Sequence, residues 1–208
     1  MTQPPPPSTP IAPLTRADLV LAADRMDVRF DGERLIIPFF GTSHTITDTG
    51  VTGPGGKQTT PAVADVLKDY VVHCPESPPP EDRLISFREL EGAGPLVVSF
   101  ANNTNKTITS TFTGRREELR RAAEPLSGIP ALDSNGYDLS IRFEALPGVP
   151  IRLLFNDAEE PFPAQCTLLL HASIEAYLKM RAIFTLGTFL CGKLAANSYN
   201  SHNREKTL

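Results

Sequence analysis

Two short segments of the sequence place charged side chains where they could bind a ligand or take part in catalysis. The first is 86–90 (SFREL), in which the charged residues Arg88 and Glu89 interrupt an otherwise apolar predicted strand just before a glycine-rich turn. A guanidinium group binds carboxylates and other anions through a planar fork of N–H donors. Arg88 and Glu89 are therefore candidate ligand-binding residues.

The second segment is 155–164 (FNDAEEPFPA), which places three carboxylates at the end of a buried strand, between two phenylalanines. Carboxylates beside apolar rings can have raised pKa values, and they can act as general acids or bases or bind a divalent cation. We expect Arg88 to supply the opposite charge. The candidates in this segment are Asn156, Asp157, Glu159 and Glu160.

A structural interpretation of the same residues is equally open. An Asn-Asp pair starts turns through hydrogen bonds from the backbone to its side chains, and glutamates at a turn are commonly exposed to water. Arg88 and one of the acids would then form an internal ion pair that holds a turn in place. Each interpretation that joins the two segments requires them to meet in the folded chain.

The loop around Gly56-Lys57 resembles a phosphate-binding loop only in part. The pattern G-x-x-x-x-G-K-[ST] needs a leading glycine for its turn and a hydroxyl for magnesium. Val51 and Gln58 occupy those two positions. We therefore interpret the segment 50–56 as a flexible loop.

Cysteine and histidine are too few and too widely spaced for a common metal site. The chain has three cysteines, without a CxxC motif. Neither His73-Cys74 nor the pair Cys166 and His171 has a usual zinc or iron–sulfur spacing. The sequence also lacks G-x-S-x-G, H-E-x-x-H and the dinucleotide fingerprint. We predict no metal site and no cofactor.

Composition excludes several classes of partner. The 208 residues carry 20 basic and 24 acidic side chains, so the basic excess of a nucleic-acid-binding protein is missing. No apolar run approaches the roughly 18 residues of a membrane-spanning helix. The odd number of cysteines argues against a disulfide framework. We expect a cytoplasmic protein that binds neither nucleic acid nor membrane.

Hydrophobic periodicity predicts strands joined by tight turns, with helices at irregular intervals. Apolar residues alternate with polar ones over 137–144, and Asp31-Gly32 is a hairpin signal. The predicted strands are 26–30, 33–40, 84–90, 96–100, 137–144, 151–155 and 166–170. The predicted helices begin after Thr15 and Thr60 and cover 115–126, 174–178 and 182–194, whereas 101–113 is ambiguous.

This order of elements predicts an α+β fold, an antiparallel sheet with helices packed on it, because the regular alternation of a parallel sheet is missing. Residues 1–13 contain six prolines and are expected to form a disordered tail. We expect a single domain over 14–196. The polar residues 197–208 are expected to be a frayed tail.

From residue 84 to 194 the chain resembles an uncharacterised bacterial and archaeal family, a domain of unknown function that is common in anaerobes. The family motifs are S-F-R-E-L-x-G and F-N-D-x-x-E-x-F-P-A, which stand here as SFREL at 86–90 and FNDAEEPFPA at 155–164. Members often occur beside iron–sulfur or corrinoid proteins. The resemblance implies an α+β domain and an iron–sulfur or corrinoid protein as partner, but no catalytic role.

Three functions follow from these observations. The first is a binding or accessory module in anaerobic redox or one-carbon metabolism. The second is an enzyme that uses the acids of segment 155–164 with Arg88 for acid–base or divalent-cation chemistry. In the third, both motifs are purely structural.

Overall fold

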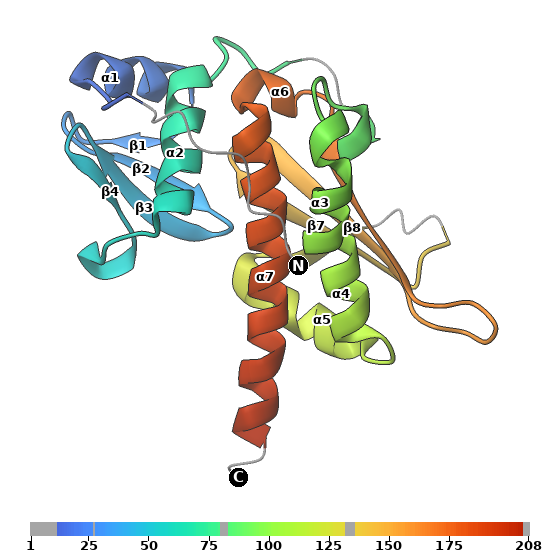
Figure 1. The fold of residues 1–208 in the computed structure, drawn as a ribbon. Coiled ribbons are helices and arrows are strands. Elements are labelled where there is room, and N and C mark those ends of the chain that lie inside the picture. Colours follow the sequence, from blue (N-terminus) through green and yellow to red (C-terminus); the bar gives the residue numbers. More distant parts are fainter. Residues whose placement is uncertain (1–11, 27, 80–82, 132–135, 206–208) are drawn as a thin grey trace.

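The computed structural model describes residues 12–26, 28–79, 83–131 and 136–205, with side chains as far as Tyr199. In this part of the chain two antiparallel sheets and the helices around them form an α+β fold, which confirms the predicted class (Figure 1). The strand order is β1-β2-β3-β4 in the first sheet and β5-β9-β8-β7-β6 in the second. The sequence predicted one sheet, and the structure has two.

The first sheet is a meander that follows α1. Its elements are α1 (Arg16–Arg25), β1 (Arg29–Phe30), β2 (Leu35–Phe39), β3 (Thr42–Thr47) and β4 (Gly50–Thr52). The predicted cap of α1 is confirmed, since Thr15 and Asp18 form a reciprocal capping box. Among the described residues, β1 pairs with β2 only at Leu35 and Ile36, so the described part of β1 does not pair with Pro38, and its missing N–H is tolerated.

One predicted loop is in part a strand. Residues 50–52 pair with β3 as β4, and Val51 is buried, so the expected loop begins only after Thr52. A short 3-10 turn, η1 (Pro54–Gly56), then leads to α2 (Pro61–His73). Thr60 caps α2 and Pro61 occupies its first turn, as the sequence predicts.

The second sheet is built on a three-stranded meander. Its strands are β5 (Leu84–Ser86), β6 (Ile129–Pro130), β7 (Leu139–Leu146), β8 (Val149–Asn156) and β9 (Gln165–His171). Ile141 and Phe143 point into the core, and Arg142 and Glu144 are exposed, as predicted for β7. Ser140, expected on the exposed face, is buried instead. The predicted strand over 84–90 ends early, at the 3-10 turn η2 (Phe87–Glu89).

The segment 96–100 is helical, and its prediction as a strand is wrong. After η3 (Gly94–Leu96), the chain forms α3 (Val97–Asn103) and α4 (Asn105–Phe112). The ring of Phe100 stacks on Phe87 with the centroids 3.9 Å apart. Packing against other helices therefore overrides the β preference of the local valines.

The last part of the chain forms a helix that lies between the two halves of the fold. After α5 (Arg116–Ala123), η4 (Glu124–Leu126) and α6 (Ile174–Tyr177), helix α7 (Met180–Glu205) contacts α2, α3, α4 and α5. Figure 1 shows α2 and the first sheet on one side of α7 and α3–α5 on the other. None of the described helices combines the length and the apolar character needed to cross a bilayer.

Helix α7 also extends past the expected boundary at residue 196. The Asn197 side chain donates to the Ala122 carbonyl at 2.9 Å, and the Ser198 hydroxyl donates to Glu118 at 2.8 Å. The start of the expected frayed tail, 197–208, is thus helical and packed on α5. Most of the expected N-terminal tail, residues 1–11, lies outside the described residues, whereas Leu14 is buried.

Candidate functional site

The SFREL segment forms a turn that is held by its own hydrogen bonds. The backbone N–H and hydroxyl of Ser86 donate to the Glu89 carboxylate at 2.7 and 2.8 Å, which closes a capping box around η2. These two bonds, helped by nearby Arg83, lower the pKa of the Glu89 carboxyl. Glu89 therefore has a structural role in this turn.

Arg88 acts on this turn only through the weak attraction between its positive charge and the Glu89 carboxylate. Its side chain is exposed, and it makes no ion pair or hydrogen bond with any residue that the structure describes. It is available to a ligand, because no hydrogen bond or ion pair within the described chain holds it in place.

The FND part of the second motif joins three turns. The Asp138 N–H donates to the Asn156 side-chain oxygen at 3.0 Å, and the Asp157 N–H donates to the Asp138 carboxylate at 2.8 Å. The Asp157 carboxylate in turn accepts from the N–H groups of Gly114 and Ala158, at 2.7 and 2.8 Å. The motif thus fastens the end of β8 to β7 and to the turn before α5.

The remaining acids lie on an exposed turn between β8 and β9. Glu159 and Glu160 are exposed, and Phe162 beside them is 68% exposed. No ion pair joins Arg88 to Asp157, Glu159 or Glu160 among the described residues, so the expected meeting of the two motifs is not observed. In the same part of the chain, no group of three or more His, Cys, Asp or Glu side chains is arranged to hold a metal ion.

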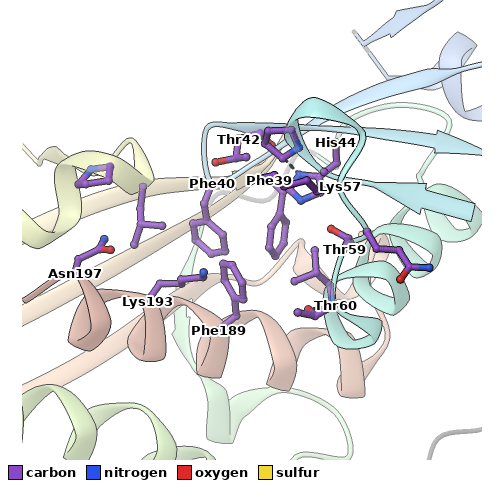
Figure 2. Close-up of a pocket in the computed structure, with 16 residues that line it drawn as sticks. Phe39, Phe40, Thr42, His44, Lys57, Thr59, Thr60, Phe189, Lys193 and Asn197 are labelled. Atoms are coloured by element: carbon purple, nitrogen blue, oxygen red, sulfur yellow. Dashed lines mark hydrogen bonds between the residues drawn. The ribbon is translucent and has the colours of Figure 1, made fainter. Parts of the chain in front are cut away.

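A pocket of about 520 Å³ opens elsewhere, where the first sheet meets α7 (Figure 2). Its lining comes from 39–63, which includes the β2–β3 turn, η1 and the start of α2, from 125–126 in η4, and from 189–197 in α7. This volume lies in the range of small-molecule sites. Two other hollows, one beside α5 and one on α1, are at least as large but more open to solvent. The pocket is therefore the candidate functional site.

Three aromatic rings form the apolar part of the pocket. Phe40 stacks on Phe189 with the centroids 5.6 Å apart, and Phe39 lies 4.9 Å from Phe189. Phe39 and Phe40 are buried, whereas Phe189 is half-buried and is the ring most open to a ligand. Figure 2 shows the three rings grouped together, with Lys193 beside them.

A tight turn holds these rings in place. Phe40 has φ 45° and Gly41 has φ 73°, and the left-handed region is uncommon for an aromatic residue. The Phe40 N–H donates to the Ala145 carbonyl of β7 at 2.9 Å. A Cβ on Gly41 would lie 2.0 Å from the Ser127 hydroxyl, so only glycine fits there. This turn connects the first sheet to the second at the pocket.

The polar part of the pocket contains His44 and two lysines. His44 is only 7% exposed, and its Nδ1 lies 2.9 Å from the Thr42 carbonyl. Because a carbonyl only accepts, Nδ1 carries the hydrogen. Nε2 has no hydrogen-bond partner within the described chain. The exposed side chains of Lys57 and Lys193 lie on the rim, with the Lys193 Nζ 5.5 Å from the centre of the Phe189 ring.

The lining has a net positive charge. Its sixteen residues include Lys57 and Lys193, and none of them is Asp or Glu. Thr42, Thr59 and Asn197 add uncharged hydrogen-bonding groups. The pocket therefore combines an apolar interior with cations at its rim, an arrangement that suits an organic anion.

The sequence contained one weak signal for this site. Gly56-Lys57 was recognisable, but it failed the phosphate-loop pattern, and its interpretation as a flexible loop assigned no role to Lys57. The aromatic rings give no sequence signal for a binding site, because hydrophobic residues at helical or strand spacing indicate a core position first. Lys193 belongs to no motif that would single it out.

Comparison with known proteins identifies the family. No curated protein and no solved structure matches the chain. A family model, described as "Domain of unknown function (DUF3786)", matches residues 18–193, a range that includes all three pocket phenylalanines and both pocket lysines. The chain belongs to this family.

Proposed function

We propose that this protein is a binding module for a small organic anion, which it holds in the pocket between the first sheet and α7. The observation that carries the proposal is the lining itself, where two lysines lie at the rim, Lys193 over the ring of Phe189, without a single carboxylate among the lining residues. The two exposed positive charges attract an anion to the rim, and the aromatic surface beside them can hold its apolar part.

The arrangement of the two lysines supports one ligand that contacts both halves of the fold. Lys57 belongs to the loop before α2, and Lys193 belongs to α7. The half-buried ring of Phe189 offers a surface for an apolar or planar group between them. We therefore expect a ligand with a negative group and an apolar body.

Thermal shift and calorimetric titration with simple probes test this proposal. We expect benzoate or phenyl phosphate to bind saturably at millimolar concentration and to raise the Tm, because a ligand that binds the native state stabilises it. Neutral benzyl alcohol and cationic benzylamine should bind at least about tenfold more weakly, a difference of roughly 1.4 kcal/mol.

Lysine variants locate the site. The Lys57→Met, Lys193→Met double variant keeps the aliphatic stems and should lose at least about tenfold in affinity for the anions. Lys106→Met is the matched control, since Lys106 is an exposed lysine of α4 outside the pocket, and it should bind as the wild type does. Absence of binding by both anions, or equal binding by the double variant, would overturn the proposal.

We retain two finer proposals from the sequence. One is a cytoplasmic location, supported by free cysteines at all three positions. The other is an accessory role toward an iron–sulfur or corrinoid protein, supported by the resemblance described above. Anaerobic co-purification from the native host tests the second proposal, and recovery of the chain without a stoichiometric partner of that kind would count against it.

A further inference from the structure

We propose that the negative group of the ligand is a phosphate monoester, bound where the N-terminus of α2 meets His44 and Lys57. This inference rests on the proposed function and specifies its ligand class. Three independent features of the pocket carry it.

The first feature is the N-terminus of α2, whose first residues line the pocket. Thr59, Thr60 and Val63 line the pocket, and Figure 2 shows Thr59 and Thr60 at the start of this helix. The thirteen-residue helix has no acidic residue in its first turn, and the Thr60 hydroxyl accepts from the Val63 N–H at a long 3.5 Å. The partial positive charge of a helix N-terminus favours phosphate groups.

The second feature is the free nitrogen of a buried imidazole. His44 is more than nine-tenths buried, its Nδ1 donates to the Thr42 carbonyl, and its Nε2 has no hydrogen-bond partner within the described residues. A neutral Nε2 accepts a hydrogen bond from a protonated phosphate oxygen, and a protonated one donates to a bare oxygen. A phosphate monoester, with a second pKa near 6, presents both forms near neutral pH, whereas a carboxylate presents only the bare oxygen.

The third feature is the kind of cation. The pocket is lined by lysines and threonines and, within the described chain, by no arginine. Arginine provides the planar fork that matches a carboxylate, whereas lysine acts as a compact charge that binds phosphate oxygens from any direction. Lysine with hydroxyl groups and a helix N-terminus therefore favours a tetrahedral anion over a planar one.

The test compares phenyl phosphate with benzoate by calorimetric titration of the full chain. We expect phenyl phosphate to bind at least tenfold more tightly, and inorganic phosphate to compete with it in a 31P NMR titration. Benzoate that binds as tightly as phenyl phosphate would overturn this inference and leave the proposed function standing. Failure of both anions to bind would overturn the proposed function itself.

Two variants at one position test the placement of the phosphate. Asp and Asn are both good N-cap residues, so Thr60→Asp and Thr60→Asn should both keep α2 capped. The aspartate adds a negative charge at the proposed phosphate position, and the asparagine does not. Phenyl phosphate should bind Thr60→Asp at least tenfold more weakly than Thr60→Asn. If both variants fold and bind phenyl phosphate with equal affinity, the proposed placement of the phosphate at the N-terminus of α2 is wrong.

Discussion

Arg88 belongs to the SFREL motif and Asp157 to the FND motif, but the surroundings of the two side chains differ. The Asp157 carboxylate accepts from the backbone N–H groups of Gly114 and Ala158, while Arg88 is exposed without an ion pair in the described part of the chain. We expect Asp157→Ala to lower the free energy of unfolding by about 1 kcal/mol, the contribution of a partly exposed hydrogen-bonded group. Urea unfolding measures this change.

Arg88→Ala is the matched comparison. A surface substitution away from such contacts changes the free energy of unfolding by less than about 0.5 kcal/mol. A loss of about 3–5 kcal/mol, typical of breaking a buried ion pair, would instead restore the idea that Arg88 pairs with the acids.

The three cysteines offer a second prediction at the scale of single residues. All three are buried, and burial raises the pKa of each thiol, that of Cys166 to about 12. A raised pKa leaves little thiolate at pH 8, and the thiolate is the reactive form. We expect the native protein to react very slowly with a thiol reagent, and all three thiols to react rapidly in denaturant. Fast labelling of a native thiol would contradict the packing described here.

At the scale of elements, two glycines of α7 have opposite surroundings. A Cβ on Gly187 would lie 2.6 Å from the Phe100 ring, which is already stacked on Phe87, whereas a Cβ on Gly192 would meet nothing within 4 Å. Gly187→Ala should therefore lower the free energy of unfolding by about 1–2 kcal/mol, because overpacking exceeds the gain in helix propensity. Gly192→Ala should raise it by about 0.5–1 kcal/mol.

Thermal and urea unfolding of both variants check this pair. The shared helix makes each substitution the control for the other, since the difference in backbone entropy is the same. Equal effects would show that α7 does not pack closely against α3 at Gly187.

Sequence patterns predicted the elements that local residues determine. Alternation predicted β7, and the residues around Thr15 and Thr60 predicted the starts of α1 and α2. The same reasoning missed α3, because packing of Phe100 between Phe87 and α7 decides its conformation, and no local pattern reports that contact. A second sheet was missed for a similar reason, since pairing between distant strands depends on the tertiary fold.

At the scale of the whole molecule, the site is assembled from parts of the chain that the sequence keeps far apart. Phe40 and Lys57 come from the first sheet and its following loop, and Phe189 and Lys193 come from the last helix. A sequence motif joins residues that are close together in the sequence, so the motifs pointed to the SFREL and FND segments and not to the pocket. Their best-defined contacts, those of Glu89, Asn156 and Asp157, stabilise turns.

An NMR titration of the 15N-labelled protein with phenyl phosphate tests the central claim most directly, because it locates the bound anion without substituting any residue. We predict saturable shifts of backbone amides around His44, Thr59, Thr60 and Lys193, with little change elsewhere. Shifts concentrated at 86–90 and 156–160, or no saturable shifts at millimolar ligand, would contradict the assignment of the pocket between the first sheet and α7 as the binding site.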